Sequence, residues 1–446
     1  MSTKKLKVHF IGIGGIGVSA LARYYLENGY KVSGSDLVAS EITNGLKKLG
    51  TKIIIGKHKA GNLPKNIDLV VYSPAVQSNN PEFQRAKKLK IKILSYPEAL
   101  GELTKKYLTI AISGTHGKST TTAMIGLLLV KAGFDPTVII GTKLKEFGDS
   151  THSTSSGLTL SNIEGSNYRV GKSQYLVIEA DEHMASFLNY WPKIIVLTNI
   201  EADHLDYYKN IGNIKKAFDE FISHLPKDGI LITHKSIDKK ALPKLKKILK
   251  LPGAHNIYNA SLALAVARAL KIPDKVSFKA LSDYKGSWRR FEEKNLTFNN
   301  KQLTIISDYG HHPTQVRVTL EATREKFSKN IIWCVYQPHQ YQRTYYLFKN
   351  FVKVFKMAAT QKWIDKLIIT DIYDVAGREN KKIKKKVSSQ KLVKTINKSR
   401  VMYLPNEKIL EYLRQNLKGR EVVIIMGAGD IYNLTLRLTG LNKNHY

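Results

Sequence analysis

The sequence has one cysteine, Cys334, among its 446 residues, so no disulfide can form within the chain. It also lacks any run of 18 consecutive apolar residues, the usual mark of a transmembrane helix. Hydrophobic residues still make up 43% of the chain, which is enough for ordinary cores. We therefore expect a cytoplasmic protein with no membrane span and about three domains, present as a monomer or homodimer.

Acidic residues are scarce beside basic ones, with 36 Asp and Glu against 71 Lys and Arg, and the net charge is +35. Such a charge attracts nucleic acid, anionic membranes or polyanionic ligands. The lysines are spread along the whole chain and do not gather in one arm. We therefore expect an anionic small-molecule substrate and no nucleic-acid partner, with a basic nucleotide-binding protein as an alternative.

Residues 113–121, Ser-Gly-Thr-His-Gly-Lys-Ser-Thr-Thr, stand between an apolar run at 107–112 and a helix predicted for 122–131. A strand, a glycine-rich turn and a helix N-terminus together form a phosphate-binding arrangement, because backbone N–H groups and the helix dipole face the anion. Lys118 is expected to reach the β- and γ-phosphates, and Ser119 to ligate Mg²⁺. The strict P-loop pattern has glycine where this chain has Ile112.

A second glycine-rich turn, residues 12–17, joins a predicted strand at 7–12 to a helix at 18–28. The next predicted strand, 31–35, ends at Asp36, which lies 24 residues beyond Gly12. This is the βαβ fingerprint of dinucleotide binding. Any nucleotide that carries a diphosphate can use such a turn, so an NAD-dependent dehydrogenase is one alternative.

Acidic residues follow two predicted strands in the middle of the chain. Glu179 ends the buried run 175–178, while Asp203 and His204 follow the run that begins at 193. Because α/β sheets bind ligands at the carboxyl ends of their strands, these three side chains are candidates for a Mg²⁺ site. Residues 141–172, rich in Gly, Ser and Thr, are expected to be loops.

The remaining chain alternates strands with helices, which predicts an α/β fold. Strands are expected at 303–307, 330–336, 366–370, 401–404 and 421–426, with a clear helix at 314–326. The predicted domains are a Rossmann-like domain at 1–106, a central P-loop ATPase domain at 107–294 and a second Rossmann-like domain at 295–446.

Several motifs occur in one order along nearly the whole chain: HFIGIGGIGVSALA, SGTHGKSTTTAM, VIEADE, TNIEADHLDYY, SDYGHHPTQV, QPHQYQRT and MGAGDI. In this combination the sequence resembles the Mur ligases of peptidoglycan synthesis. The resemblance implies a UDP-sugar domain, a central ATPase and a C-terminal domain that brings the amino acid. It also implies a role in cell-wall biogenesis, and through it in cell shape and division.

The implied activity is the ATP- and Mg²⁺-dependent joining of L-alanine to the lactyl carboxylate of UDP-N-acetylmuramate through an acyl phosphate. A peptidoglycan-recycling ligase that adds a tripeptide to the same sugar nucleotide is the alternative within the family.

The resemblance also assigns residues. It implies catalytic roles for Lys118, His204 and His311, and a metal site of Ser119, Glu179 and His204. ATP would be bound by Gly114, Thr115, His116, Gly117, Lys118, Ser119, Thr120, His255, Asn256, Asn259, Arg290 and Asp308. The UDP-sugar would be bound by Gly12, Gly14, Gly15, Ile16, Gly17, Asp36 and Ser73, and the amino acid by Tyr309, His311 and Arg343. Apart from the resemblance, Asn167 and Arg169 of the predicted loop segment are further candidates for contact with the UDP-sugar.

Two positions depart from the family pattern. His183 and Met184 replace the usual Ser-Asp after Glu-Ala-Asp-Glu, and Gln340 replaces an arginine near the expected amino-acid pocket. A neutral amide cannot form the two-pronged contact that an arginine makes with a carboxylate. Gln340 is therefore expected to affect amino-acid affinity.

Overall fold

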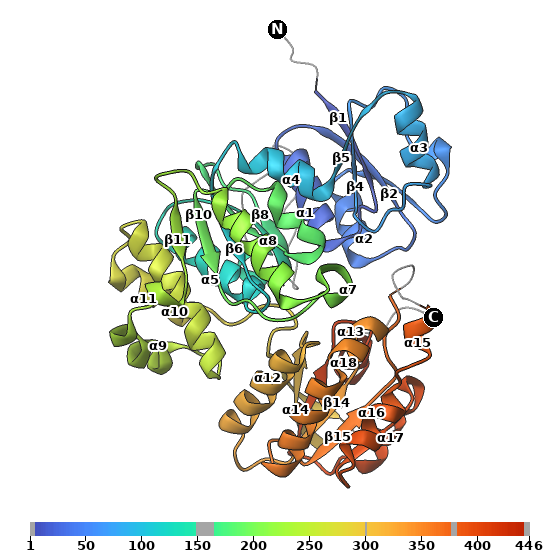
Figure 1. Ribbon diagram of the computed structural model, residues 1–446, viewed down its shortest axis with the longest axis vertical. Helices are drawn as coiled ribbons and strands as arrows, with labels where there is room; N and C mark the ends of the chain where they lie inside the picture. Colours follow the sequence, from blue (N-terminus) through green and yellow to red (C-terminus); the bar gives the residue numbers. More distant parts are fainter. Residues whose placement is uncertain (1–4, 149–164, 299–300, 376–380, 441–446) are drawn as a thin grey trace. The chain divides into compact units, whose positions relative to one another are not determined.

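The computed structural model describes residues 5–148, 165–298, 301–375 and 381–440 (Figure 1). The chain divides into two compact units. Unit 1 comprises residues 1–200, 215–241 and 260–282, and unit 2 comprises residues 201–214, 242–259 and 283–446. Unit 1 contains two sheets and unit 2 contains a third, each mainly parallel with helices between its strands. The predicted α/β class is confirmed.

The first sheet of unit 1 is entirely parallel, in the order β3-β2-β1-β4-β5. The order reverses beside β1, which is where doubly wound sheets bind their ligands. The strands are β1 (Lys7–Ile11), β2 (Lys31–Asp36), β3 (Lys52–Ile55), β4 (Leu69–Tyr72) and β5 (Lys92–Ser95). The helices are α1 (Ile16–Glu27), α2 (Glu41–Lys48), α3 (Pro81–Lys88) and α4 (Tyr96–Thr104).

The second sheet of unit 1 has the order β11-β10-β6-β9-β7-β8, and only the β7–β8 pair is antiparallel. Its strands are β6 (Leu108–Ser113), β7 (Thr137–Leu144), β8 (Ser166–Arg169), β9 (Tyr175–Glu179), β10 (Ile194–Leu197) and β11 (Ile230–Ile232). The associated helices are α5 (Lys118–Lys131), α6 (Lys145–Gly148), α8 (Ile211–Ser223), α10 (Ala254–Ala269) and α11 (Asp274–Asp283), of which α8 and α10 each have one end in unit 2.

Two predictions for this region were wrong in part. Helix α5 begins at Lys118, not at residue 122, because apolar periodicity does not register a polar first turn. Residues 141–172 are not all loop, since β7 extends to Leu144 and pairs with β8. The Ser and Asn side chains of β8 are buried at this sheet edge, so their polarity misled the prediction. Residues 149–164 of that segment lie outside the described residues.

The sheet of unit 2 has the order β12-β13-β17-β14-β15-β16, antiparallel only between β12 and β13. Its strands are β12 (Glu292–Phe298), β13 (Lys301–Asp308), β14 (Ile332–Tyr336), β15 (Lys366–Ile369), β16 (Val401–Tyr403) and β17 (Val422–Met426). Its helices are α7 (Leu205–Tyr208), α9 (Leu242–Ile248), α12 (Pro313–Lys326), α13 (Tyr341–Tyr346), α14 (Phe348–Thr360), α15 (Lys381–Lys384), α16 (Ser389–Ile396), α17 (Ile409–Asn416) and α18 (Tyr432–Leu438).

Strand residues of this sheet alternate between two cores. Cys334 of β14 and Ile424 of β17 belong to the core that contains residues of α12, α14 and α16. Val335 and Ile425, their chain neighbours, belong to the core that contains residues of α17 and α18. This period of two is what a sheet covered on both faces requires.

Strand β12 was not predicted, because it begins with two glutamates and a lysine and has no apolar run. The predicted boundary between residues 294 and 295 falls within this strand. Among the described residues, no helix is long and apolar enough to cross a membrane.

Candidate active site

The phosphate loop of unit 1 links the buried strand β6 to helix α5. Gly114 and Gly117 adopt φ angles of 128° and 85°, which only glycine takes easily. Asn199, just beyond β10, holds the loop by accepting from Thr115 N at its carbonyl and from His116 N at Oδ1, both at 3.0 Å. The loop is therefore anchored by a neighbouring strand end, and its shape depends on tertiary contacts.

Lys118 lies in the first turn of α5 with its side chain 15% exposed. Its Nζ donates to Gly114 O at 2.7 Å and to Glu182 Oε2 at 2.6 Å, and Asp181 Oδ1 lies 3.6 Å away. Burial alone would lower the pKa of Lys118, but these carboxylates hold it above its ordinary value. Burial raises the pKa of Glu182 to about 7 against the opposing effect of Lys118. The ammonium is thus mostly buried, charged and paired with carboxylates.

Ser119 and Glu179 form an all-oxygen pair beside this lysine. Ser119 Oγ donates to Glu179 Oε1 at 2.5 Å, and the other carboxylate oxygen accepts from Gly141 N. A hydroxyl and a carboxylate at this separation can share one hard cation, which is the donor chemistry that Mg²⁺ prefers. These two predicted metal ligands are brought together. The third predicted ligand, His204, belongs to unit 2. Its backbone N–H donates to Asp203 Oδ1 at 2.8 Å.

The glycine turn of the first sheet is held by the end of β2. Ser35 O accepts from Gly12 N at 2.8 Å and from Ile13 N at 3.1 Å, and Asp36 Oδ2 accepts from Gly14 N at 2.7 Å. These bonds fix the turn immediately before α1. The first-turn amides of that helix have no intrahelical partner and suit an anionic diphosphate.

Three other residues predicted to meet the UDP-sugar have different surroundings. Ser73 N donates to Ile11 O at 2.9 Å, which places Ser73 at the strand end beside the glycine turn. Asn167 Nδ2 donates to Ile16 O at 2.5 Å, at the start of α1. The guanidinium of Arg169 instead pairs with Asp135 at 2.6 Å.

Unit 2 contains a small pocket around Arg343. This arginine is 8% exposed, and its Nε donates to Asp203 Oδ1 at 3.0 Å. Its Nη1 lies 3.1 Å from Gln340 Oε1, so Gln340 serves as a neutral acceptor beside the guanidinium. Burial opposes ionisation of Asp203, but Arg343 and nearby histidines hold its pKa well below the usual range. The pocket is lined by Asp203, His204, Leu205, Asp206, Gln340, Arg343, Tyr346 and Leu347.

His311 and Tyr309 lie close to one another in unit 2. Their rings meet edge to face with centroids 5.4 Å apart, and His311 Nδ1 lies 3.0 Å from Tyr309 O. Because a carbonyl can only accept, this bond assigns the ring proton to Nδ1 and leaves the lone pair on Nε2. Burial, and then Arg343 and His339, lower the pKa of His311 well below its usual value. The imidazole is therefore neutral.

Asp308 ends β13 and organises the chain around it. Its carboxylate accepts from Phe291 N at 2.9 Å and from Gly310 N at 2.8 Å. Burial raises the pKa of Asp308, while Arg290 and these backbone bonds oppose the rise. The guanidinium carbon of Arg290 lies 5.0 Å from the centre of the Tyr309 ring.

His255, Asn256 and Asn259 all lie in the first two turns of α10, and both asparagines are buried. Asn256 Nδ2 donates to Pro252 O at 2.7 Å, which ties the helix to the preceding turn. Burial, followed by the charge of Arg317, lowers the pKa of His255 to about 4. His255 is thus a neutral ring at physiological pH.

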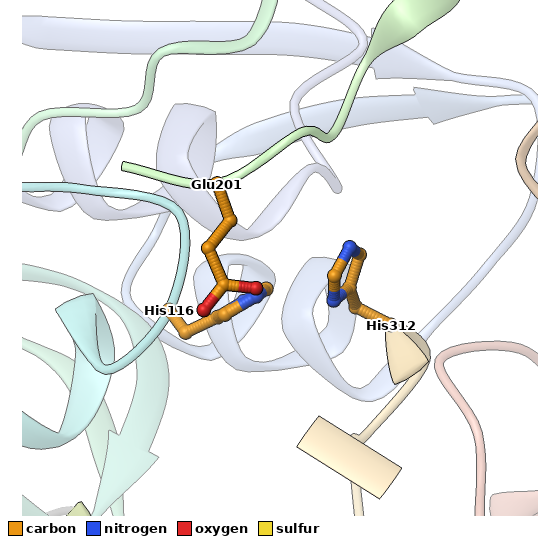
Figure 2. Close-up of side chains that lie close together, drawn as sticks. All are labelled: His116, Glu201 and His312. Atoms are coloured by element: carbon orange, nitrogen blue, oxygen red, sulfur yellow. The ribbon is translucent and has the colours of Figure 1, made fainter. Parts of the chain in front are cut away.

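Figure 2 shows Glu201 and His312 of unit 2 as sticks, together with His116 of the phosphate loop. Thr314 Oγ1 donates to Glu201 Oε2 at 2.6 Å. His312 caps α12 by accepting from Thr314 N at Nδ1, at 3.2 Å, while its Nε2 lies 3.2 Å from Ala202 O. The predicted roles did not include Glu201 or His312.

The sequence also assigned no role to Glu182 or Asn199, and it suggested Asp203 only as a candidate for the Mg²⁺ site. Each follows β9 or β10 of the second sheet of unit 1 by two to six residues. Their position after the carboxyl end of a strand was therefore the sequence feature that could have identified them as site residues. Their specific partners, Lys118, the phosphate loop and Arg343, depend on the fold.

Models of the Mur ligase family match consecutive parts of this chain: "Mur ligase family, catalytic domain" at residues 7–108, "Mur ligase middle domain" at 112–249 and "Mur ligase, glutamate ligase domain" at 289–429. A curated UDP-N-acetylmuramate–L-alanine ligase of Acetivibrio thermocellus is 39% identical, and the match covers 96% of this chain and 94% of that protein.

Two solved structures are similar over nearly the whole chain. The UDP-N-acetylmuramate–alanine ligase MurC of Thermotoga maritima has a TM-score of 0.76 and 26% identity, with 98% of this chain and 99% of that chain covered. A murein peptide ligase of Psychrobacter arcticus has a TM-score of 0.68 and 22% identity, covering 99% and 100%. The latter likeness shows the fold alone.

Proposed function

The chain belongs to the Mur ligase family, and we propose that it is the ATP-dependent ligase that joins L-alanine to UDP-N-acetylmuramate. The observation that carries this proposal is the 39% identity, over nearly the full length of both chains, with a curated ligase of that name. The product is a precursor of peptidoglycan, and we place the reaction in the cytoplasm.

The reaction must activate a carboxylate that is itself a poor electrophile. The lactyl carboxylate oxygen of UDP-N-acetylmuramate attacks the γ-phosphorus of ATP, the bond to the β-phosphate oxygen breaks, and ADP leaves. The neutral amine of L-alanine then attacks the acyl carbon, and inorganic phosphate leaves as the amide forms. Phosphoryl transfer of this kind depends mainly on positioning and on neutralisation of charge.

In unit 1 the proposed roles follow the geometry. Lys118 binds the terminal phosphates in competition with Glu182, which holds the ammonium otherwise. Backbone amides of residues 117–120, at the start of α5, would cradle the phosphates, because those of Thr115 and His116 already donate to Asn199. Ser119 and Glu179 would hold Mg²⁺, which supplies charge neutralisation at the transferring phosphoryl group, and His204 is proposed as a further ligand. The glycine turn at residues 12–17 and the start of α1 bind the UDP-sugar diphosphate.

In unit 2 we propose that Arg343 binds the amino-acid carboxylate. Asp203 holds Nε and Gln340 contacts Nη1, so the guanidinium keeps its orientation at the pocket that Arg343 lines. Tyr309, whose ring contacts that of His311, is proposed to bind the amino acid as well. His311 Nε2 is the proposed acceptor for the proton that the amine of L-alanine loses. His255, Asn256, Asn259, Arg290 and Asp308 are proposed for the nucleotide.

The alternatives explain fewer observations. A dehydrogenase built on the glycine turn leaves the phosphate loop and the Ser119–Glu179 pair without a purpose. A nucleic-acid-binding protein leaves the same features unused. The recycling ligase shares the fold, but the curated relative with 39% identity carries the name of the alanine-adding enzyme.

The test is release of phosphate from ATP with Mg²⁺ and UDP-N-acetylmuramate, with single amino acids and the tripeptide offered in turn and the product mass recorded. We expect release that requires L-alanine, with the mass of one alanyl residue added to the sugar nucleotide. Release with the tripeptide alone would assign the protein to recycling, and no release with any acceptor would refute ligase activity.

A further inference from the structure

A buried carboxylate, Glu82, is the centre of a polar cluster in the first sheet of unit 1. It lies in the first turn of α3 and is 0% exposed. Its Oε2 accepts hydrogen bonds from His9 Nε2 at 2.9 Å and from Ser35 Oγ at 2.8 Å. Its Oε1 accepts hydrogen bonds from His58 Nδ1 at 2.6 Å and from Asn62 Nδ2 at 3.2 Å. One side chain thus connects β1, β2, the segment after β3 and the start of α3.

These four contacts suit an ionised glutamate. Burial alone would raise the pKa of Glu82, but the hydrogen bonds from His9, His58 and Ser35 hold it below its ordinary value. A carboxylate only accepts, so all four partners donate. The N-terminus of α3, capped by Asn80, further favours the negative charge.

Ser35 connects this cluster to the glycine turn. Its hydroxyl is held by Glu82, while its carbonyl receives Gly12 N and Ile13 N at 2.8 and 3.1 Å. The next residue, Asp36, receives Gly14 N. Three successive amides of the turn therefore rest on a strand end whose side chain is fixed by Glu82. Space there is tight, because a Cβ on Gly34 would lie 2.6 Å from Ile13 Cδ1.

We propose that Glu82 is a positioning residue for the sugar nucleotide: it holds Ser35, and through Ser35 the glycine turn, in the shape that binds the diphosphate of UDP-N-acetylmuramate. This inference rests on the proposed function. Glu82 is fully buried, and its carboxylate contacts Ser35 and not the residues of the turn. Its effect should therefore fall on affinity for the sugar nucleotide and not on the phosphate loop of the second sheet.

The informative variant is Glu82→Gln, which keeps the size of the side chain but turns one acceptor oxygen into a donor. Two of the four donors then face an N–H₂ group, and the cluster must rearrange. We expect the dissociation constant of UDP-N-acetylmuramate, measured by calorimetry without ATP, to rise about tenfold or more. The KM for ATP and kcat at saturating sugar nucleotide should change less than about twofold.

The matched control is Asp68→Asn. Asp68 immediately precedes β4 of the same sheet, and its carboxylate accepts from Lys7 N at 2.7 Å, at the opposite end of β1 from the glycine turn. The Asp68→Asn substitution also replaces a carboxylate with an amide. It therefore shows the effect of a less stable sheet on binding when the glycine turn is unchanged. We expect unchanged affinity for the sugar nucleotide in this variant.

A second variant, Ser35→Ala, tests the same role if the Glu82→Gln protein does not fold. It removes the hydroxyl and leaves the carbonyl that holds the turn, so we expect the same weakening in smaller degree. Folded variants of both kinds that bind UDP-N-acetylmuramate as the wild type does would overturn the positioning role, as would equal weakening in Asp68→Asn. Failure of the wild type to bind UDP-N-acetylmuramate would instead overturn the proposed function.

Discussion

Lys118 is held by protein groups that a phosphate can replace. Its ammonium contacts Gly114 O and Glu182, both within 2.7 Å. In the role we propose for Lys118, a bound γ-phosphate would compete with the carboxylate of Glu182. This arrangement keeps a buried cation paired when no nucleotide is bound.

Lys118→Ala should remove one preorganised electrostatic contact from the phosphoryl-transfer step. Such a loss costs about 3–4 kcal/mol, a factor of roughly 10²–10³ in kcat. Steady-state release of phosphate and of ADP would measure it, with both falling together. A near-normal rate in a folded Lys118→Ala protein would contradict the role of this residue.

Arg343→Lys should raise the KM for L-alanine by roughly 10–100-fold. Lysine keeps the positive charge beside Asp203 but loses the planar fork that holds a carboxylate in two places. The KM for ATP and the thermal midpoint should change little. Arg324→Lys is the matched control, because Arg324 pairs with Asp365 at 2.8 Å and does not line the pocket. Equal effects of the two substitutions on the KM would count against the assignment.

His255 should stay neutral well below the usual range for histidine, because its pKa is lowered to about 4 by burial and by Arg317. Folding thus favours the neutral ring, and the stability linked to His255 is present above pH 6.5 and lost as the pH falls through 4. The shift of about 2.5 units corresponds to roughly 3 kcal/mol. Histidine NMR titration, with His255→Gln to assign the resonance, would measure it. A ring that titrates near pH 6.5 would contradict this expectation.

At the scale of the element, the close contact between β2 and the glycine turn depends on Gly34. A Cβ there would lie 2.6 Å from Ile13 Cδ1 and 2.8 Å from Phe10 O, and the backbone oxygen belongs to a paired strand that cannot easily move.

Gly34→Ala should therefore lower the free energy of unfolding by about 1–3 kcal/mol through overpacking. It should also weaken UDP-N-acetylmuramate binding, because the displaced neighbour, Ile13, is part of the turn. Thermal unfolding and calorimetric binding would measure both effects. Gly61→Ala is the control, since a Cβ at Gly61 has nothing within 4 Å. A stability equal to that of the control would show that the strand accommodates the methyl group.

Helices and strands could be predicted from the sequence where their own residues show the hydrophobic pattern of that element. Buried parallel strands such as β14 and β17 are continuous apolar runs, and the sequence analysis placed both within two residues of their observed ends. Strand β12 was not predicted, because a strand at the edge of a sheet gains stability from its neighbour and needs no apolar run of its own. Strand β7 was not predicted either, although it contains the buried apolar run Val138-Ile139-Ile140.

At the scale of the whole molecule, the net charge of +35 should attract the two polyanionic substrates, ATP and UDP-N-acetylmuramate, more than the zwitterion L-alanine. Long-range attraction raises the encounter rate of anions and is screened as ionic strength rises. We expect kcat/KM for UDP-N-acetylmuramate to fall as salt increases, while the KM for L-alanine stays nearly constant. Initial rates over a salt series would measure this. A salt effect of equal size on both substrates would point to a general effect on the protein.

The sequence alone determined the features in which chemistry is local. A glycine-rich turn followed by Lys118 and Ser119 can be read directly, because the turn, the helix start and the two side chains are contiguous. The tertiary structure decided which distant groups complete each site. Glu182 reaches Lys118 across 64 residues, and Asp203 reaches Arg343 across 140. Such pairs arise from strand order and burial, which place charges together and remove the water that would otherwise screen them.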